Sequence, residues 1–324
     1  MSRAIFGFKI FGVAITLAMA AGMTLNAFAA SAPPEAAQAG YTTNTFSSSF
    51  TSATVDMKNT KNKGFQWYLW NLFSVQANPA GVVLNSDGTV TLLGTSQFNG
   101  QLVTAVTYTA TNTFAGTAFG GGAYIEAEMQ FDPKVVQAAS ANGSSGWPSF
   151  WALSIEGNVA GRSDQWPGQS AGYVHSVETD FFEADAPQAK PPGYGGAMHD
   201  WYGIYNKTCG QGLCQAKLSN GAGLRVVPTG TDFAQFHRYG FLWVPATATS
   251  AGYAKFYFDD QQLGPAQDWQ LYTNQPPPAL GQPWAFGVLD QLHMFLILGT
   301  GPLQPLTVRS VNVWQANGTS NLNY

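Results

Sequence analysis

Charged side chains are scarce in this sequence. Asp, Glu, Lys and Arg make up only 10% of its 324 residues, and the 14 basic residues form no cluster. Nucleic-acid binding requires a basic patch that neutralises phosphates, so the composition argues against a nucleic-acid partner. Apolar residues reach 45%, which argues against general disorder, because disordered chains combine low hydrophobicity with high net charge.

Long apolar runs are absent except at the N-terminus. Arg3 and Lys9 precede an apolar run at residues 10–23, which leads to the small-x-small sequence Ala27-Phe28-Ala29. This order predicts a signal peptide at residues 1–29. An uncleaved membrane anchor is the alternative, since the run approaches the ~20 residues that span a bilayer. The cleavage site and the polar sequence after it favour cleavage, so we expect a secreted or periplasmic protein without stable membrane association.

Cysteine is nearly absent as well. The two cysteines, Cys209 and Cys214, are separated by four residues. Two thiols without a neighbouring histidine do not fill a tetrahedral zinc site. In an exported protein such a close pair predicts a local disulfide, with two free thiols as the alternative.

The sequence also lacks a repeat of fixed period, which argues against a propeller or a solenoid. Residues 30–43 have no periodic pattern and are predicted to be a flexible linker. Residues 44–324 contain short alternating or apolar runs between turn signals, including a hairpin pattern at 81–93. Only residues 133–141 have a helical pattern. We therefore predict one all-β domain, an antiparallel two-sheet jelly-roll sandwich.

Three acids stand close together in one predicted strand: Glu178, Asp180 and Glu183. Burying charge in a β-prone, aromatic-rich strand is costly unless chemistry uses it. Alternate residues of a regular strand share a face, so Glu178 and Asp180 point the same way and Glu183 points the opposite way. A β-bulge of one residue around Phe181-Phe182 would return Glu183 to the shared face.

With that bulge, the acids suit a retaining glycosidase. Four strand steps at roughly 3.3 Å separate the two glutamate α-carbons by about 13 Å, and inward-leaning carboxyl groups can approach the ~5–5.5 Å of such enzymes. One carboxylate attacks the anomeric carbon, while the other protonates the leaving oxygen and then activates water. Asp180 would hold the nucleophile and raise the proton affinity of Glu183. A solvated acidic face or a calcium site is the alternative for the acids alone.

The sequence around the acids resembles glycoside hydrolase family 16. Residues 178–183 match each acid of that family's bulged Glu-x-Asp-x-x-Glu signature, which occurs in members acting on β-1,3-glucans and agars. Residues 146–153 resemble the family's Gly-x-Trp-Pro-Ala-Phe-Trp segment. Further segments resemble family strands in the same order, so the resemblance extends over about residues 44–315. They are residues 121–129, 236–243, 255–261, 290–298 and 308–315.

The resemblance implies a concanavalin-like jelly roll with a substrate cleft on its concave sheet. It implies that Glu178 is the nucleophile, Asp180 the assisting acid and Glu183 the acid/base. Two positions depart from the family pattern: Glu128 replaces a common basic residue, and Leu298-Gly-Thr-Gly301 replaces an Asn-containing run. Family members often hold a structural calcium on the convex face. A structural calcium therefore stays open for this chain, although no contiguous loop of oxygen ligands is visible, and the mechanism itself requires no cofactor.

Aromatic residues are the remaining candidates for binding sugar. Trp147 and Trp151 are four residues apart in a strand-like segment and share a face, which the resemblance places in the cleft. Trp166 and Trp201 are further candidates, although large rings are equally typical of cores. His199 stands two residues before Trp201, as in a His-x-Trp pair that lines the cleft in the family. A structural histidine is the alternative there.

Together these features predict a secreted, endo-acting retaining glycoside hydrolase. The small number of basic residues disfavours a sulfated substrate, so we expect a neutral β-linked polysaccharide, with β-1,3-glucan preferred to agarose, and a monomeric protein. Two alternatives stay open. One is an agarase-like or transglycosylase member of the same family. The other is a non-catalytic carbohydrate-binding jelly roll, which would keep the aromatic cleft but need not keep all three acids.

Overall fold

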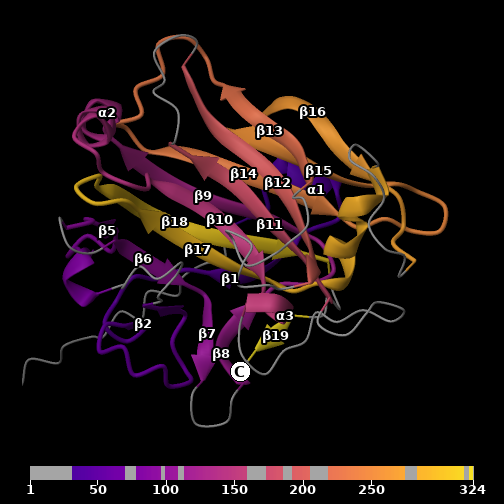
Figure 1. Cartoon of the computed structure of the whole chain (residues 1–324), viewed down its shortest axis with the longest axis horizontal. Helices are drawn as coiled ribbons and strands as arrows, with labels where there is room; N and C mark the ends of the chain where they lie inside the picture. The colour runs from indigo at the N-terminus through magenta and orange to yellow at the C-terminus, as the bar shows by residue number, and fades with distance from the viewer. Residues whose placement is uncertain are drawn as a thin grey trace, which may run out of the picture.

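The structure is a computed structural model that describes residues 31–69, 78–95, 99–108, 113–158, 173–184, 192–204, 218–273, 283–316 and 321–323. The predicted signal peptide lies outside these residues. In the described part, the strands form two sheets of eight strands and one sheet of three strands (Figure 1). The predicted all-β, two-sheet sandwich is therefore confirmed.

Sheet A contains the strands β1 (Thr43–Ser47), β4 (Val82–Leu84), β5 (Val90–Leu92), β9 (Ala123–Phe131), β14 (His237–Val244), β15 (Gly252–Phe258), β16 (Gln261–Trp269) and β18 (Leu306–Gln315). Their order is β16-β15-β14-β9-β18-β5-β4, and β1 also pairs with β18. The predicted hairpin at residues 81–93 corresponds to β4 and β5, which pair antiparallel. Gly88 in its turn has φ +86°, a conformation that favours glycine.

Sheet B contains the strands β2 (Val55–Asp56), β3 (Trp67–Tyr68), β6 (Gly100–Val103), β10 (Ser149–Ser154), β11 (Tyr173–Glu183), β12 (Gly193–Ile204), β13 (Leu218–Val226) and β17 (Met294–Thr300). Their order is β13-β12-β11-β10-β17-β6-β3-β2. Its long strands pair antiparallel, whereas the short β2 and β3 run parallel. Sheet B carries the three acids on β11.

The third sheet contains β7 (Ala105–Tyr108), β8 (Thr113–Ala118) and β19 (Leu322–Asn323), close to the C-terminus (Figure 1). The helices are α1 (Pro34–Gln38), α2 (Pro133–Ala141), α3 (Ile155–Asn158) and the 3₁₀ helices η1 (Pro79–Gly81) and η2 (Pro283–Gln291). The predicted helix at residues 133–141 is α2, whose first turn is capped by Asp132. None of the helices in the described ranges has the length and apolar character to cross a bilayer.

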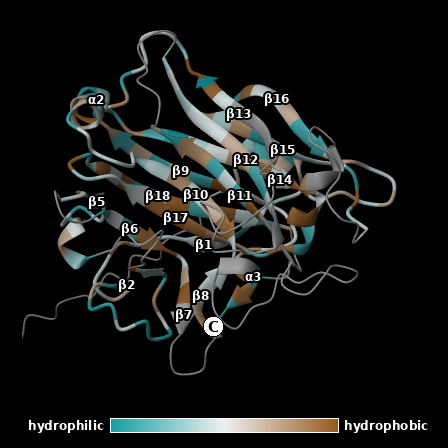
Figure 2. Ribbon diagram, viewed as in Figure 1, coloured by the Kyte–Doolittle hydropathy of each residue, from teal (hydrophilic) through white to brown (hydrophobic). Residues whose placement is uncertain are grey.

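The core lies between sheets A and B. In β9, Ile125, Ala127 and Met129 point into it, as period-two alternation requires. On the opposing sheet, all seven residues of β17 are buried, and this strand is mainly hydrophobic in Figure 2. β17 is buried on both faces because a second apolar cluster covers one end of the outer face of sheet B.

That second cluster joins the small sheet to sheet B. Leu153, Phe295 and Ile297 of sheet B pack there with Val106 and Phe114 of the small sheet. The small sheet therefore covers part of the outer face of sheet B. The uncovered remainder of this face contains the acids.

The N-terminal segment differs from its prediction. Instead of a flexible linker throughout residues 30–43, it contains α1 and the start of β1. Ala36 and Tyr41 are buried against the outer face of sheet A, and the Tyr41 hydroxyl donates to the Trp243 carbonyl over 2.9 Å. The small apolar residues of this segment show no periodic pattern, but they are sufficient to bury one turn of helix.

Candidate active site

The predicted bulge is present in β11. Between Asp180 and Glu183, β11 has one residue more than each of its neighbours, β10 and β12. Against β10, Asp180 and Phe182 oppose consecutive residues, which leaves Phe181 without a partner. The extra residue restores Glu183 to the face of the sheet that carries Glu178 and Asp180.

Two adjacent phenylalanines explain why the strand bulges there. Phe181 and Phe182 are both buried in the core between the sheets. The Phe181 ring lies 4.8 Å from that of Phe241, and the Phe182 ring lies 4.5 Å from that of Tyr239. A regular strand would direct one of the two rings to the cleft. Burying a phenylalanine is worth roughly 1.5–3 kcal/mol, so the bulge keeps both rings in the core.

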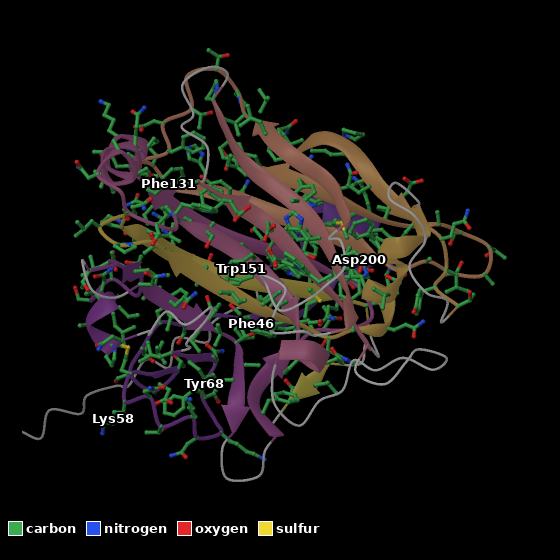
Figure 3. All side chains as sticks on the ribbon, viewed as in Figure 1. Phe46, Lys58, Tyr68, Phe131, Trp151 and Asp200 are labelled. Atoms are coloured by element: carbon green, nitrogen blue, oxygen red, sulfur yellow. The ribbon has the colours of Figure 1, made fainter. Side chains whose placement is uncertain are left out.

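The acids line one cleft on the outer face of sheet B. Glu178, Asp180 and Glu183 surround a cavity of about 300 Å³ together with Trp147 and Trp151. Trp151 is only 8% exposed, because its ring also packs in the cluster beneath the small sheet. Figure 3 labels Trp151 near the centre of the molecule in this view.

Glu178 and Asp180 are held by two side chains of β12. His199 lies opposite Glu178 in the pairing of β11 with β12. Its Nε2 is 2.9 Å from Oδ2 of Asp180, which is 2% exposed. The indole Nε1 of Trp201 donates to Oε2 of Glu178 over 3.0 Å. One ligand atom each of Glu178, Asp180 and His199 lies within 4.8 Å of the others, so these three groups form one polar cluster.

Glu183 is held from the opposite side, by the indole of Trp147. Its Nε1 donates to Oε1 of Glu183 over 2.9 Å, and the ring is 38% exposed at the edge of the cleft. Gly146, with φ +79°, turns the chain just before Trp147. Gly301 lets this turn approach β17 closely, since a Cβ there would lie 2.5 Å from the Ser145 carbonyl oxygen.

The predicted site residues are thus largely brought together. Glu178, Asp180, Glu183, Trp147 and Trp151 line the cleft, and both predicted residues of β12 contact its acids. Trp166, Cys209 and Cys214 lie outside the described residues, so the roles assigned to them stay predictions.

Some cleft residues were not singled out from the sequence. They are Asn99, Gln101, Ser149, Gly299, Thr300 and Gly301. Only the departure from the family pattern at residues 298–301 pointed to any of these positions, because small residues stand there where the family resemblance predicts an asparagine. No sequence pattern pointed to Gln101, because its place in the cleft follows from the pairing of β6 with β17.

The second departure from the family pattern is compensated on the outer face of sheet A. Glu128 on β9 forms an ion pair with Arg309 on the adjacent β18. Both partners are partly exposed, so the pair contributes little to stability. It lies on β9 and β18 of sheet A, not among the residues that line the cleft.

Two groups of side chains in the described residues resemble metal sites. The cluster of Glu178, Asp180 and His199 includes an imidazole, whereas calcium prefers six to eight oxygen ligands. The second group is Glu35, Glu126 and Asp260 on the outer face of sheet A. It offers three side-chain ligands, and Arg238 already forms an ion pair with Asp260. We therefore assign no calcium to either group.

Fold and site together define an all-β jelly-roll protein with a three-carboxylate cleft on one sheet. No family model and no curated protein matches the sequence. Among solved structures, an endo-1,3-beta-glucanase from Streptomyces sioyaensis matches with a TM-score of 0.50 and 17% identity, over 91% of this chain and 100% of that chain. The Emp46p carbohydrate recognition domain (Y131F mutant) matches with a TM-score of 0.40 and 11% identity, over 78% and 88%. The first similarity supports the fold, and the second adds no argument.

Proposed function

We propose that this chain is a secreted, retaining, endo-acting glycoside hydrolase of the family 16 type, with a neutral β-1,3-glucan as its substrate. The observation that carries the proposal is the bulge in β11, which directs Glu178, Asp180 and Glu183 into one cleft. The acid signature and the fold similarity to an endo-1,3-beta-glucanase support it.

The reaction is a double displacement. Glu178 attacks the anomeric carbon and forms a glycosyl ester as the bond to the leaving oxygen breaks, and Glu183 donates a proton to that oxygen. Water then enters, Glu183 removes its proton, and the hydroxide displaces Glu178 from the anomeric carbon. This returns both carboxyl groups to their starting protonation states.

The hydrogen-bond partners of the acids fit these roles. The Trp201 indole donates to Oε2 of Glu178 and so fixes the carboxylate that would attack the anomeric carbon. His199 fixes Asp180 beside Glu178. The Trp147 indole fixes Glu183 from the far side of the cleft, where a proton donor to the leaving group is required.

The cleft lining supports a neutral substrate. No lysine or arginine lines the cleft among the described residues, whereas carboxylates do. A sulfate or uronate group would meet negative charge without a compensating cation.

Export and a Cys209–Cys214 disulfide are part of the same proposal and rest on the sequence. A disulfide mapping of the mature protein tests the latter.

The proposal is tested by reducing-sugar release from laminarin, lichenan, agarose, carrageenan and xyloglucan. We expect cleavage of laminarin with retention of anomeric configuration, and loss of activity of about 10³-fold or more in Glu178→Ala and Glu183→Ala. Both variants should still bind glycan. Full activity in either variant would contradict the assignment. Binding by the wild type without cleavage would instead support the carbohydrate-binding alternative.

A further inference from the structure

Four cleft residues lie side by side on adjacent strands of sheet B. Glu183 on β11 is opposite Ser149 on β10, which is opposite Gly299 on β17, which is opposite Gln101 on β6. All four line the same cleft. The row therefore extends the floor of the cleft from the catalytic strand towards β6.

Gln101 carries an unused hydrogen-bond acceptor at the end of this row. The residue is 7% exposed, and its side-chain carbonyl oxygen, Oε1, is buried without a hydrogen-bond partner among the described residues. Buried acceptors are normally paired, and an unpaired one marks a place where a water or a ligand donor belongs. In this cleft the available donor would be a sugar hydroxyl.

Gly299 leaves space beside the Gln101 side chain. A Cβ at this position would lie 3.1 Å from Ser149 Oγ and 3.6 Å from Gln101 Cγ, so it would fill the gap between these two side chains. Gly299 is not among the residues with positive φ, so its backbone conformation does not require glycine. The absence of a side chain therefore serves to keep the floor of the cleft open.

The row also fixes which part of a glycan can reach Gln101. β6 lies three strand spacings from β11, about 14 Å at roughly 4.8 Å per spacing. A group that distant from Glu183 meets a sugar other than the one being cleaved. No lysine or arginine accompanies Gln101 in the described lining, so this part of the cleft offers no cation to pair with an anionic sugar.

From these observations we propose that Gln101 and Gly299 form a subsite for a neutral sugar unit beside the reacting one, where the Gln101 carbonyl accepts a hydrogen bond from a sugar hydroxyl. The proposal rests on the proposed function and extends it to substrate selection. Gly299 admits the hydroxyl-bearing edge of the ring, and Gln101 discriminates against units that lack a donor at that edge or carry charge.

The test is calorimetric binding of laminarihexaose to the full chain carrying Glu178→Ala, which prevents turnover. Adding Gln101→Leu removes the acceptor and should raise the Kd about tenfold, the usual effect of losing one neutral hydrogen bond. Gly299→Ala fills the gap and should raise it by a similar factor. Gln101→Glu keeps an acceptor oxygen and should bind more tightly than Gln101→Leu. Gln262→Leu, at an exposed position on β16, is the matched control.

Each outcome decides one proposal separately from the other. Unchanged binding by both Gln101→Leu and Gly299→Ala would overturn the subsite, whether or not the wild type cleaves laminarin. If the wild type binds without cleaving and these variants still weaken binding, the subsite stands and the hydrolase proposal fails. If laminarihexaose does not bind to Glu178→Ala at all, the subsite proposal fails, and reducing-sugar release by the wild type decides the hydrolase proposal by itself. If thermal melting shows that Gln101→Leu does not fold, the binding measured for Gly299→Ala and Gln101→Glu decides the subsite proposal.

Discussion

At the scale of single residues, two indole N–H groups hold the cleft acids, one on each of the two carboxylates proposed to be catalytic. Trp201 donates to Glu178 from β12, and Trp147 donates to Glu183 from the turn before β10. A donor favours the ionised form of the carboxylate that accepts from it. In the proposed reaction the two tryptophans thus act on different groups, the nucleophile and the acid/base, so their removal should have different consequences.

We expect Trp201→Phe to lower kcat/KM by about 10- to 100-fold, since a hydrogen bond to a charged group is worth roughly 1.5–3 kcal/mol. Its loss disfavours ionised Glu178, so the acid limb of the pH–rate profile should move to higher pH. Trp147→Phe should instead move the basic limb to higher pH, because the protonated form of Glu183 persists longer. The kcat/KM profile from pH 4 to 9 measures both. Identical profiles for the two variants would contradict the assignment of roles.

At the scale of elements, the bulge in β11 is the feature that brings the three acids to one face of the strand. Phe181 and Phe182 both occupy the core, and the acids on either side of them share the cleft face. Phe181→Ala should destabilise the fold by about 3–5 kcal/mol, the usual cost of truncating a buried phenylalanine. Urea denaturation measures this. Phe236→Ala, outside the described cores, is the control and should change stability much less.

The bulge also marks the limit of prediction from sequence. Periodicity alone assigned Glu183 to the wrong face, and only the proposed chemistry required an extra residue near Phe181. The sequence did contain the physical cause, because two adjacent large apolar rings both need burial. The place of Gln101 was not accessible in this way. It depends on long-range pairing of β6 with β17, which a local pattern does not encode.

At the scale of the whole molecule, the N-terminal segment is tied to sheet A by a group of acids. The Tyr124 hydroxyl lies 2.7 Å from Oε1 of Glu35 on α1 and 3.1 Å from Oε2 of Glu126 on β9. One hydroxyl proton serves only one of these two carboxylates. Burial raises the pKa of Glu126 to about 7, despite the Tyr124 hydrogen bond and the nearby Arg238 charge. Asp260 adds further negative charge to the group.

This group makes the stability of the protein depend on pH. Because the pKa of Glu126 is higher in the folded protein, about 7, than its ordinary value of 4.5, folding retains a proton that the unfolded chain releases. Stability should therefore fall between about pH 4.5 and 7, and the cost above pH 7 should reach about 3 kcal/mol. Burial likewise raises the pKa of Asp290 to about 6, which adds a loss of the same sign below pH 6.

Glu126→Gln separates the contribution of Glu126 to the pH dependence of stability from that of Asp290. The amide keeps the shape of a protonated carboxyl group and cannot ionise, so the variant should match the wild type near pH 4.5 and exceed it by up to about 3 kcal/mol at pH 8. Urea unfolding across this range measures the difference. Glu128→Gln, two residues along β9 and paired with Arg309 near the surface, is the matched control for removing a carboxylate from the same strand. Parallel curves for Glu126→Gln and the wild type would show that Glu126 is ionised in the fold. Its charge would then be balanced at the junction of α1 and sheet A.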